Sequence, residues 1–174
     1  MKMAYYLVVL VRIIVAPLIL IWPTPGIILS LFLDIIDADF AYHVITKKQY
    51  QVIDKLLDLW VYVFEMIIAW NTLPEFRMVL LALLTWRTIG LALMIMTSNR
   101  HILIFFGNYF ENIFFLVYFA KNVKGLDFLV SNPTAFWISI AVTVLAKAFQ
   151  EWFIHVADLS IREDLFKSKR KWKK

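Results

Sequence analysis

Four aspartates at helical spacing are the residues of this sequence that could do chemistry together. Asp34 and Asp37 are three residues apart, and Asp54 and Asp58 are four residues apart. On a helix, either spacing places both carboxylates on one side. Carboxylate oxygens are the ligands that hard divalent cations such as Mg²⁺, Mn²⁺ or Ca²⁺ prefer. The spacing therefore predicts an acidic site built by two neighbouring helices.

The composition indicates that these helices lie in a membrane. Of the 174 residues, 62% are hydrophobic, and the mean hydropathy of +0.75 is far above that of soluble globular proteins. A span needs roughly 20 mostly apolar residues, and the candidates are residues 4–22, 26–41, 52–70, 78–97, 101–120 and 133–156. These runs have helical length, and lipid allows only helices or closed barrels. We expect an all-α integral membrane bundle of six transmembrane helices, forming a single domain over residues 1–174.

The short connections and the basic residues set the expected topology. WPTPG (22–26), WNTLPEF (70–76) and SNPT (131–134) are typical of turns, and Asn132 or Ser131 is expected to cap the last helix. Lys and Arg favour the cytoplasmic side, and their distribution predicts that both termini are cytoplasmic. The basic C-terminal tail (about 160–174) is expected to lie beside anionic lipid headgroups, and no nucleic-acid partner is expected. The sequence has no cysteine, which excludes disulfides and thiolate metal sites.

An α-helix rises about 1.5 Å per residue, which gives the depth of each residue from the cytoplasmic end of its span. Counted in this way, the ionisable side chains lie toward the cytoplasmic ends of the expected spans. Such groups usually face a cavity or the bundle interior, so we expect a polar cavity open to the cytoplasm. The acids in or near it are Asp34, Asp37, Asp54, Asp58, Glu65, Glu111 and Glu151, and the bases are Arg12, Arg87 and Lys147. If all are ionised, four negative charges remain. Some carboxylates must then protonate or bind cations, and two divalent ions would balance the count.

The aspartate pattern resembles that of the CDP-alcohol phosphotransferases, which have six transmembrane helices. Their motif is D-x-x-D-G-x-x-A-R, then eight residues, then G-x-x-x-D-x-x-x-D. Ala41 falls on the family's alanine, and Arg12 with Pro17 resembles an R-x-x-x-x-P stretch in the first helix. Three positions depart from the motif: Ala38 and Gln51 replace glycines, and Tyr42 replaces the arginine. The interval between the two aspartate pairs is also one residue shorter.

The resemblance implies a reaction and roles for particular residues. A CDP-linked alcohol, often a lipid, would donate its phosphoryl group to an acceptor hydroxyl and release CMP. Two Mg²⁺ (or Mn²⁺) ions would bridge the diphosphate and the aspartates, with Asp34, Asp37, Asp54 and Asp58 as ligands and Asp58 as the catalytic base. The implied substrate-binding residues are Ala38, Ala41, Tyr42, Lys47, Lys48, Arg87 and Arg12. The site would face the cytoplasm at a bacterial or archaeal cytoplasmic membrane, and a homodimer is possible.

Three alternatives remain open at the level of the sequence. A divergent member of the same fold could keep the metal and have lost or changed its donor, since Tyr42 and Gln51 stand at altered positions. An ion-coupled transporter also places acids and bases within spans, although repeated halves and broken helices are not evident in the sequence. Finally, the acids could serve only as structural ion-pair partners of neighbouring basic residues.

Overall fold

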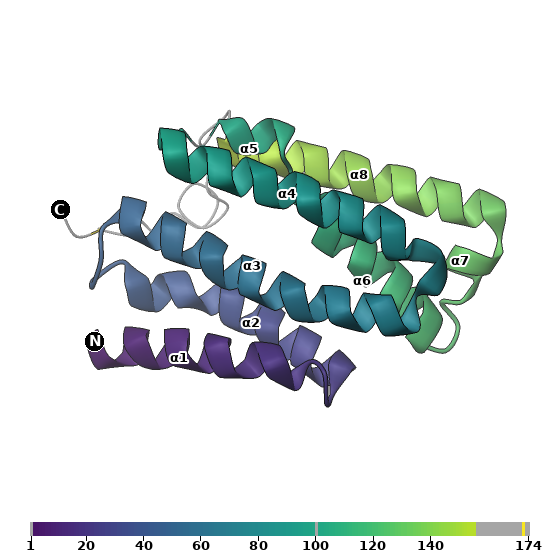
Figure 1. Cartoon of the computed structure of the whole chain (residues 1–174), viewed down its shortest axis with the longest axis horizontal. Coiled ribbons are helices and arrows are strands. Elements are labelled where there is room, and N and C mark those ends of the chain that lie inside the picture. Colours follow the sequence, from purple (N-terminus) through teal and green to yellow (C-terminus); the bar gives the residue numbers. More distant parts are fainter. Residues whose placement is uncertain (1, 100, 156–171, 173–174) are drawn as a thin grey trace. The chain divides into compact units, whose positions relative to one another are not determined.

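The structure of the chain is a computed structural model that describes residues 2–99, 101–155 and 172. These described residues form helices and no strand, which confirms the predicted all-α class. The chain divides into two compact units. Of the described residues, the first unit comprises 2–68 with 172, and the second comprises 69–99 with 101–155. Figure 1 labels the α-helices of both units.

The first unit is built from α1 (Lys2–Leu18), α2 (Pro23–Ala41) and α3 (Lys47–Thr72), which continues past the unit boundary. WPTPG was expected to be a turn, but α2 already begins within it at Pro23. Proline is favoured at the first helical position because its missing N–H has no partner there anyway. The turn itself is residues 19–22, and it is closed by a 2.8 Å bond from the Trp22 N–H to the Leu18 carbonyl.

Close packing of α1 against α2 depends on Gly26. A Cβ atom at this position would lie 2.9 Å from the Cα of Ile19. Glycine lets the two backbones approach where a side chain would separate them. This contact fixes the tight turn that brings α2 back along α1.

The second unit contains η1 (Pro74–Phe76), α4 (Arg77–Thr97), α5 (Ile102–Phe105), α6 (Tyr109–Asn122), α7 (Phe128–Ser131) and α8 (Pro133–His155). Asn132 caps α8 as predicted, because its Oδ1 accepts bonds from the Thr134 and Ala135 N–H groups at 3.0 and 3.2 Å.

The predicted fifth helix, residues 101–120, is not continuous. It is divided into α5 and α6, and the break has an identifiable cause on α4. The Nη1 of Arg87 donates to the Phe106 carbonyl at 2.7 Å, and the Nε1 of Trp86 donates to the Phe105 carbonyl at 3.1 Å. Two side chains thus bind carbonyl groups that helical N–H groups would otherwise bind.

Three helical segments of the described chain are long and apolar enough to cross a membrane: Pro74–Thr97, Ile102–Asn122 and Pro133–Gln150. All three belong to the second unit, whereas six spans were predicted. The helices of the first unit differ for physical reasons. α1 has only 17 residues, and α2 and α3 carry several charged side chains. Length and composition are therefore compatible with a membrane protein but support three spans rather than six.

Gly90 on α4 allows a test of the packing in the second unit. A Cβ atom there would lie 2.1 Å from the Cβ of Phe106, whose ring stacks on Trp86 with centroids 4.5 Å apart. We predict that Gly90→Ala destabilises the protein by about 1–3 kcal/mol through overpacking. Thermal unfolding in detergent should show a lower Tm. Adding Gly90→Ala to a Phe106→Gly chain should lower the Tm less than adding it to the unmodified chain, because Phe106→Gly removes the Cβ that the new methyl group would meet. A higher Tm for Gly90→Ala, as helix propensity alone would give, would contradict the close contact.

Candidate functional site

The centre of the first unit is the guanidinium group of Arg12, which α1 carries into contact with all four predicted aspartates. The Arg12 Nη2 lies 2.8 Å from Asp34 Oδ1 and 2.9 Å from Asp58 Oδ1. Its Nη1 contacts Asp37 and lies 3.4 Å from Asp54 Oδ1. Arg12 is buried, with 3% of its surface exposed. One cation thus connects α1 with α2 and α3.

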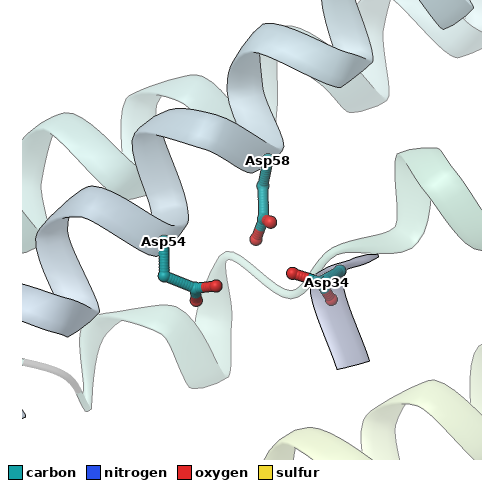
Figure 2. A group of neighbouring side chains, drawn as sticks. All are labelled: Asp34, Asp54 and Asp58. Atoms are coloured by element: carbon teal, nitrogen blue, oxygen red, sulfur yellow. The ribbon is translucent and has the colours of Figure 1, made fainter. Parts of the chain in front are cut away.

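Three of the carboxylates are arranged so that one cation could touch them all. Asp34, Asp54 and Asp58 each offer an oxygen, and these oxygens lie within 4.8 Å of one another. Figure 2 shows the side chains of Asp54 and Asp58 extending from α3 toward Asp34 on α2. Carboxylate–metal bonds are about 2.0–2.6 Å long, so the spacing suits a shared ion. The predicted meeting of the two aspartate pairs is therefore present in the structure.

Asp37 belongs to the same cluster but has a different environment. It is 2% exposed, and its Oδ1 accepts a 2.6 Å hydrogen bond from the Tyr50 hydroxyl. The same hydroxyl lies 3.4 Å from Asp54 Oδ1. With Arg12 on its other oxygen, Asp37 has a neighbour for each carboxylate oxygen. The role of Asp37 as a metal ligand stays a prediction.

Lys55 and Tyr50 complete the cluster, and the sequence analysis did not assign either to the site. The Nζ of Lys55 lies 2.8 Å from Asp54 Oδ2 and 2.7 Å from Asp58 Oδ2. Helical spacing could have revealed both residues, because Tyr50 is four residues before Asp54 and Lys55 is three before Asp58.

These contacts change the charge count on which the cation hypothesis rested. Four carboxylates face the two basic groups of Arg12 and Lys55, which leaves two formal negative charges when all are ionised. That remainder equals the charge of one divalent ion. The sequence count of four, which suggested two ions, covered a larger set that also included Glu65, Glu111, Glu151, Arg87 and Lys147. The donor set of three hard carboxylate oxygens fits Mg²⁺ or Mn²⁺ in chemistry. An entering ion would share Asp34 and Asp58 with Arg12.

The positions implied to bind substrate in the first unit differ in accessibility. Ala38 and Ala41 are buried, with 7% and 0% of their surfaces exposed. Tyr42 is the C-cap of α2, and its ring centroid lies 3.7 Å from that of His43. Lys47 and Lys48 are exposed at the start of α3. Of these positions, the two lysines are the ones that a soluble anion could reach directly.

The remaining ionisable residues of the predicted cavity have local neighbours. In the second unit, Arg87 binds the Phe106 carbonyl, Asn108 donates to Glu111 Oε2 at 2.6 Å, and Lys147 donates to Gln150 Oε1 at 3.1 Å. Glu65 is buried on α3. Convergence of the second-unit residues with the aspartates stays a prediction. The side chains of Glu151 and His155 and the basic tail, apart from Trp172, lie outside the described residues.

Comparisons of this chain with protein-family models, with curated proteins and with solved structures found no match. The resemblance to the CDP-alcohol phosphotransferases therefore rests on the residue pattern.

Replacing the central arginine tests whether the aspartates depend on a positive charge. Arg12→Gln leaves carboxylates buried without their cation, and breaking a buried ion pair costs about 3–5 kcal/mol. We predict a lower Tm in detergent and a larger rise of Tm on adding MgCl₂ than in the unmodified protein. NaCl of equal ionic strength is the salt control. Arg77→Gln is the matched control, because it also removes one arginine. The contacts that it removes are those with the Trp70 carbonyl and the Trp70 ring. Equal Mg²⁺ responses in all three proteins would contradict a cation-dependent cluster.

Proposed function

We propose that this protein is a membrane transferase that depends on a divalent cation and moves a phosphoryl-alcohol group, in particular a phosphatidyl group, during phospholipid synthesis. The donor would be a CDP-linked alcohol, the acceptor a hydroxyl group, and the released product CMP. One observation carries the proposal: Asp34, Asp54 and Asp58 offer oxygens within 4.8 Å of one another. The aspartates that resemble the family motif are thus the ones that meet in space.

The proposed setting is a bacterial or archaeal cytoplasmic membrane, with both termini cytoplasmic. In this proposal α1, α2 and α3 would lie in the bilayer in addition to the three apolar segments of the second unit. The charges on α2 and α3 weigh against this setting when composition is taken alone. Arg12 and Lys55 reduce the objection, because charged side chains within a membrane are tolerated when they pair with one another. The cluster would then be a polar site reached from the cytoplasmic face.

The proposed cation site consists of Asp34, Asp54 and Asp58, with Asp37 beside them. A divalent ion bound there would neutralise charge on the diphosphate of the donor. Lys47 and Lys48, which are exposed at the start of α3, would attract the same diphosphate electrostatically. These lysines take the place of the arginine that the motif has at Tyr42.

Asp58 is the residue that we assign as the general base. Its carboxylate would accept the proton of the acceptor hydroxyl as the acceptor oxygen bonds to the alcohol-bearing phosphorus. The bond from that phosphorus to the oxygen of CMP breaks in the same step, and CMP leaves with the electron pair. Arg12 and Lys55 hold Asp58 from two sides at 2.9 and 2.7 Å, which fixes the direction of its oxygens.

A second function is favoured by one specific contact. The Arg12 Nη2 is already within hydrogen-bonding distance of both Asp34 and Asp58. If Arg12 holds these oxygens permanently, the chain is a divergent, non-catalytic or altered-donor protein of the same architecture. The two functions differ in whether a cation and a CDP-alcohol bind.

An activity assay tests the proposed reaction. Purified protein is given CDP-diacylglycerol with glycerol phosphate, inositol phosphate or serine, and CMP release is measured. We expect release that requires Mg²⁺ and falls by about 10²-fold or more in Asp58→Asn, as for loss of a general base. Asp39→Asn is the matched control, since Asp39 is on the same helix as Asp34 but is not among the four carboxylates that contact Arg12 in the described chain. Full activity of Asp58→Asn would exclude its role as the base.

Calorimetry with Mn²⁺ separates the two functions. We predict about one bound ion per chain, because hard oxygen ligands are available at one shared position. Binding should be lost in Asp34→Asn/Asp54→Asn and retained in Asp39→Asn. Cation binding without any affinity for CDP-diacylglycerol would favour the altered-donor protein, and absence of both would identify a structural ion cluster.

A further inference from the structure

The second unit contains an apolar groove that the proposed reaction does not use. It has a volume of about 490 Å³ and lies among η1, α4, α6 and α8. The helices contribute residues at helical spacing: Val79 and Leu83 from α4, Ile113 from α6, and Ile140 and Val144 from α8. Its size is within the range of small-molecule sites, about 300–1,000 Å³.

The location of the groove indicates the chemistry of its occupant. Every residue that lines it belongs to one of the three segments able to cross a membrane. In the part of the chain that the structure describes, none of the apolar window of Pro133–Gln150 is buried. At the depth of the hydrocarbon, an apolar groove is filled by hydrocarbon, because an unfilled void forfeits the dispersion contacts of its lining. The groove therefore faces acyl chains rather than water.

One end of the groove is polar, and its charges suit a phosphate group. The rings of Phe76 and Phe136, with centroids 5.8 Å apart, mark this end. The Nζ of Lys121 lies 5.7 Å from the centre of the Phe76 ring and 2.7 Å from Glu75 Oε2. The Glu75 side chain is 62% exposed, and an exposed ion pair contributes little to stability. An anionic group could therefore replace Glu75 beside Lys121 at small cost.

We infer that this groove binds one acyl chain of a bilayer phospholipid, with the lipid phosphate at Lys121. The chain lies along Val79, Ile140 and Val144, and the headgroup lies at the Glu75 end. The inference rests on the three apolar helices lying in a bilayer and does not depend on the transferase activity.

Native mass spectrometry of the detergent-purified protein tests the site by counting retained phosphatidylglycerol. Val79→Trp and Val144→Trp fill the groove from two helices, and each has an adjacent control, Met78→Trp and Leu145→Trp, outside the lining. Met78 and Leu145 are 70% and 69% exposed, so the added rings meet no packed core there. We expect the unmodified protein to retain one lipid per chain. Both groove variants should retain roughly tenfold less phosphatidylglycerol, because the acyl contacts are lost. Both control variants should retain as much as the unmodified protein.

The charge at the groove end is tested with a second pair of variants. Lys121→Gln and Glu75→Gln both remove the ion pair, but only the first removes the cation. We expect Lys121→Gln to weaken retention of phosphatidylglycerol relative to uncharged diacylglycerol, and Glu75→Gln to preserve or strengthen it. Equal retention in groove and control variants would overturn the inference. A change from dimer to monomer in the groove variants, without loss of lipid, would also overturn it and would identify a second copy as the occupant.

Discussion

The packing of the first unit depends on one buried cation. Arg12 reaches Asp34 and Asp37 on α2 and Asp54 and Asp58 on α3, so three helices meet at one guanidinium group. A guanidinium has five donors in a rigid planar fork, which lets one side chain bind several carboxylates at fixed angles. A shift of α1 by one helical turn, about 5.4 Å, would remove Arg12 from these partners and leave four acids without it. The arginine therefore selects the alignment of the three helices as well as neutralising charge.

The same interaction connects the fold with the proposed chemistry. Buried carboxylates require counter-charge, and Arg12 with Lys55 supplies half of what four ionised aspartates need. The two negative charges that remain would attract a divalent ion, while the two bases limit how many ions the site can hold. Arg12 and a cation would bind to the same oxygens of Asp34 and Asp58, so the strength of the structural contact would reduce the affinity for the ion. Stability and cation binding would then be opposed at this point of the molecule.

Sequence patterns were sufficient for the helical class and for the meeting of the aspartates, because both follow from local spacing. They were insufficient where a distant side chain decides the local structure. The break between α5 and α6 arises from Trp86 and Arg87, which are some twenty residues earlier in the chain. Lys55 was missed for a different reason: its position near a loop does not reveal that its long side chain reaches Asp54 and Asp58. Charge counts taken along a sequence therefore mislead when long side chains can return to a buried site.

The motif that this chain resembles has two parts, the aspartates for a cation and the glycine and arginine positions for a nucleotide. The chain has the aspartates, but Ala38 and Tyr42 stand at the nucleotide positions. A cation needs only carboxylates at helical spacing, and these meet as the pattern predicts. Close approach of a nucleotide to the backbone favours glycine, but Ala38 stands there and its side chain is buried within the first unit. Tyr42 brings no charge for a diphosphate and lies against His43 instead. Since Ala38 is already covered, a donor would have to contact the exposed end of α3 at Lys47 and Lys48. Under the proposed function, the aspartates would meet the requirement for a cation, whereas the donor would be held at α3 instead of α2.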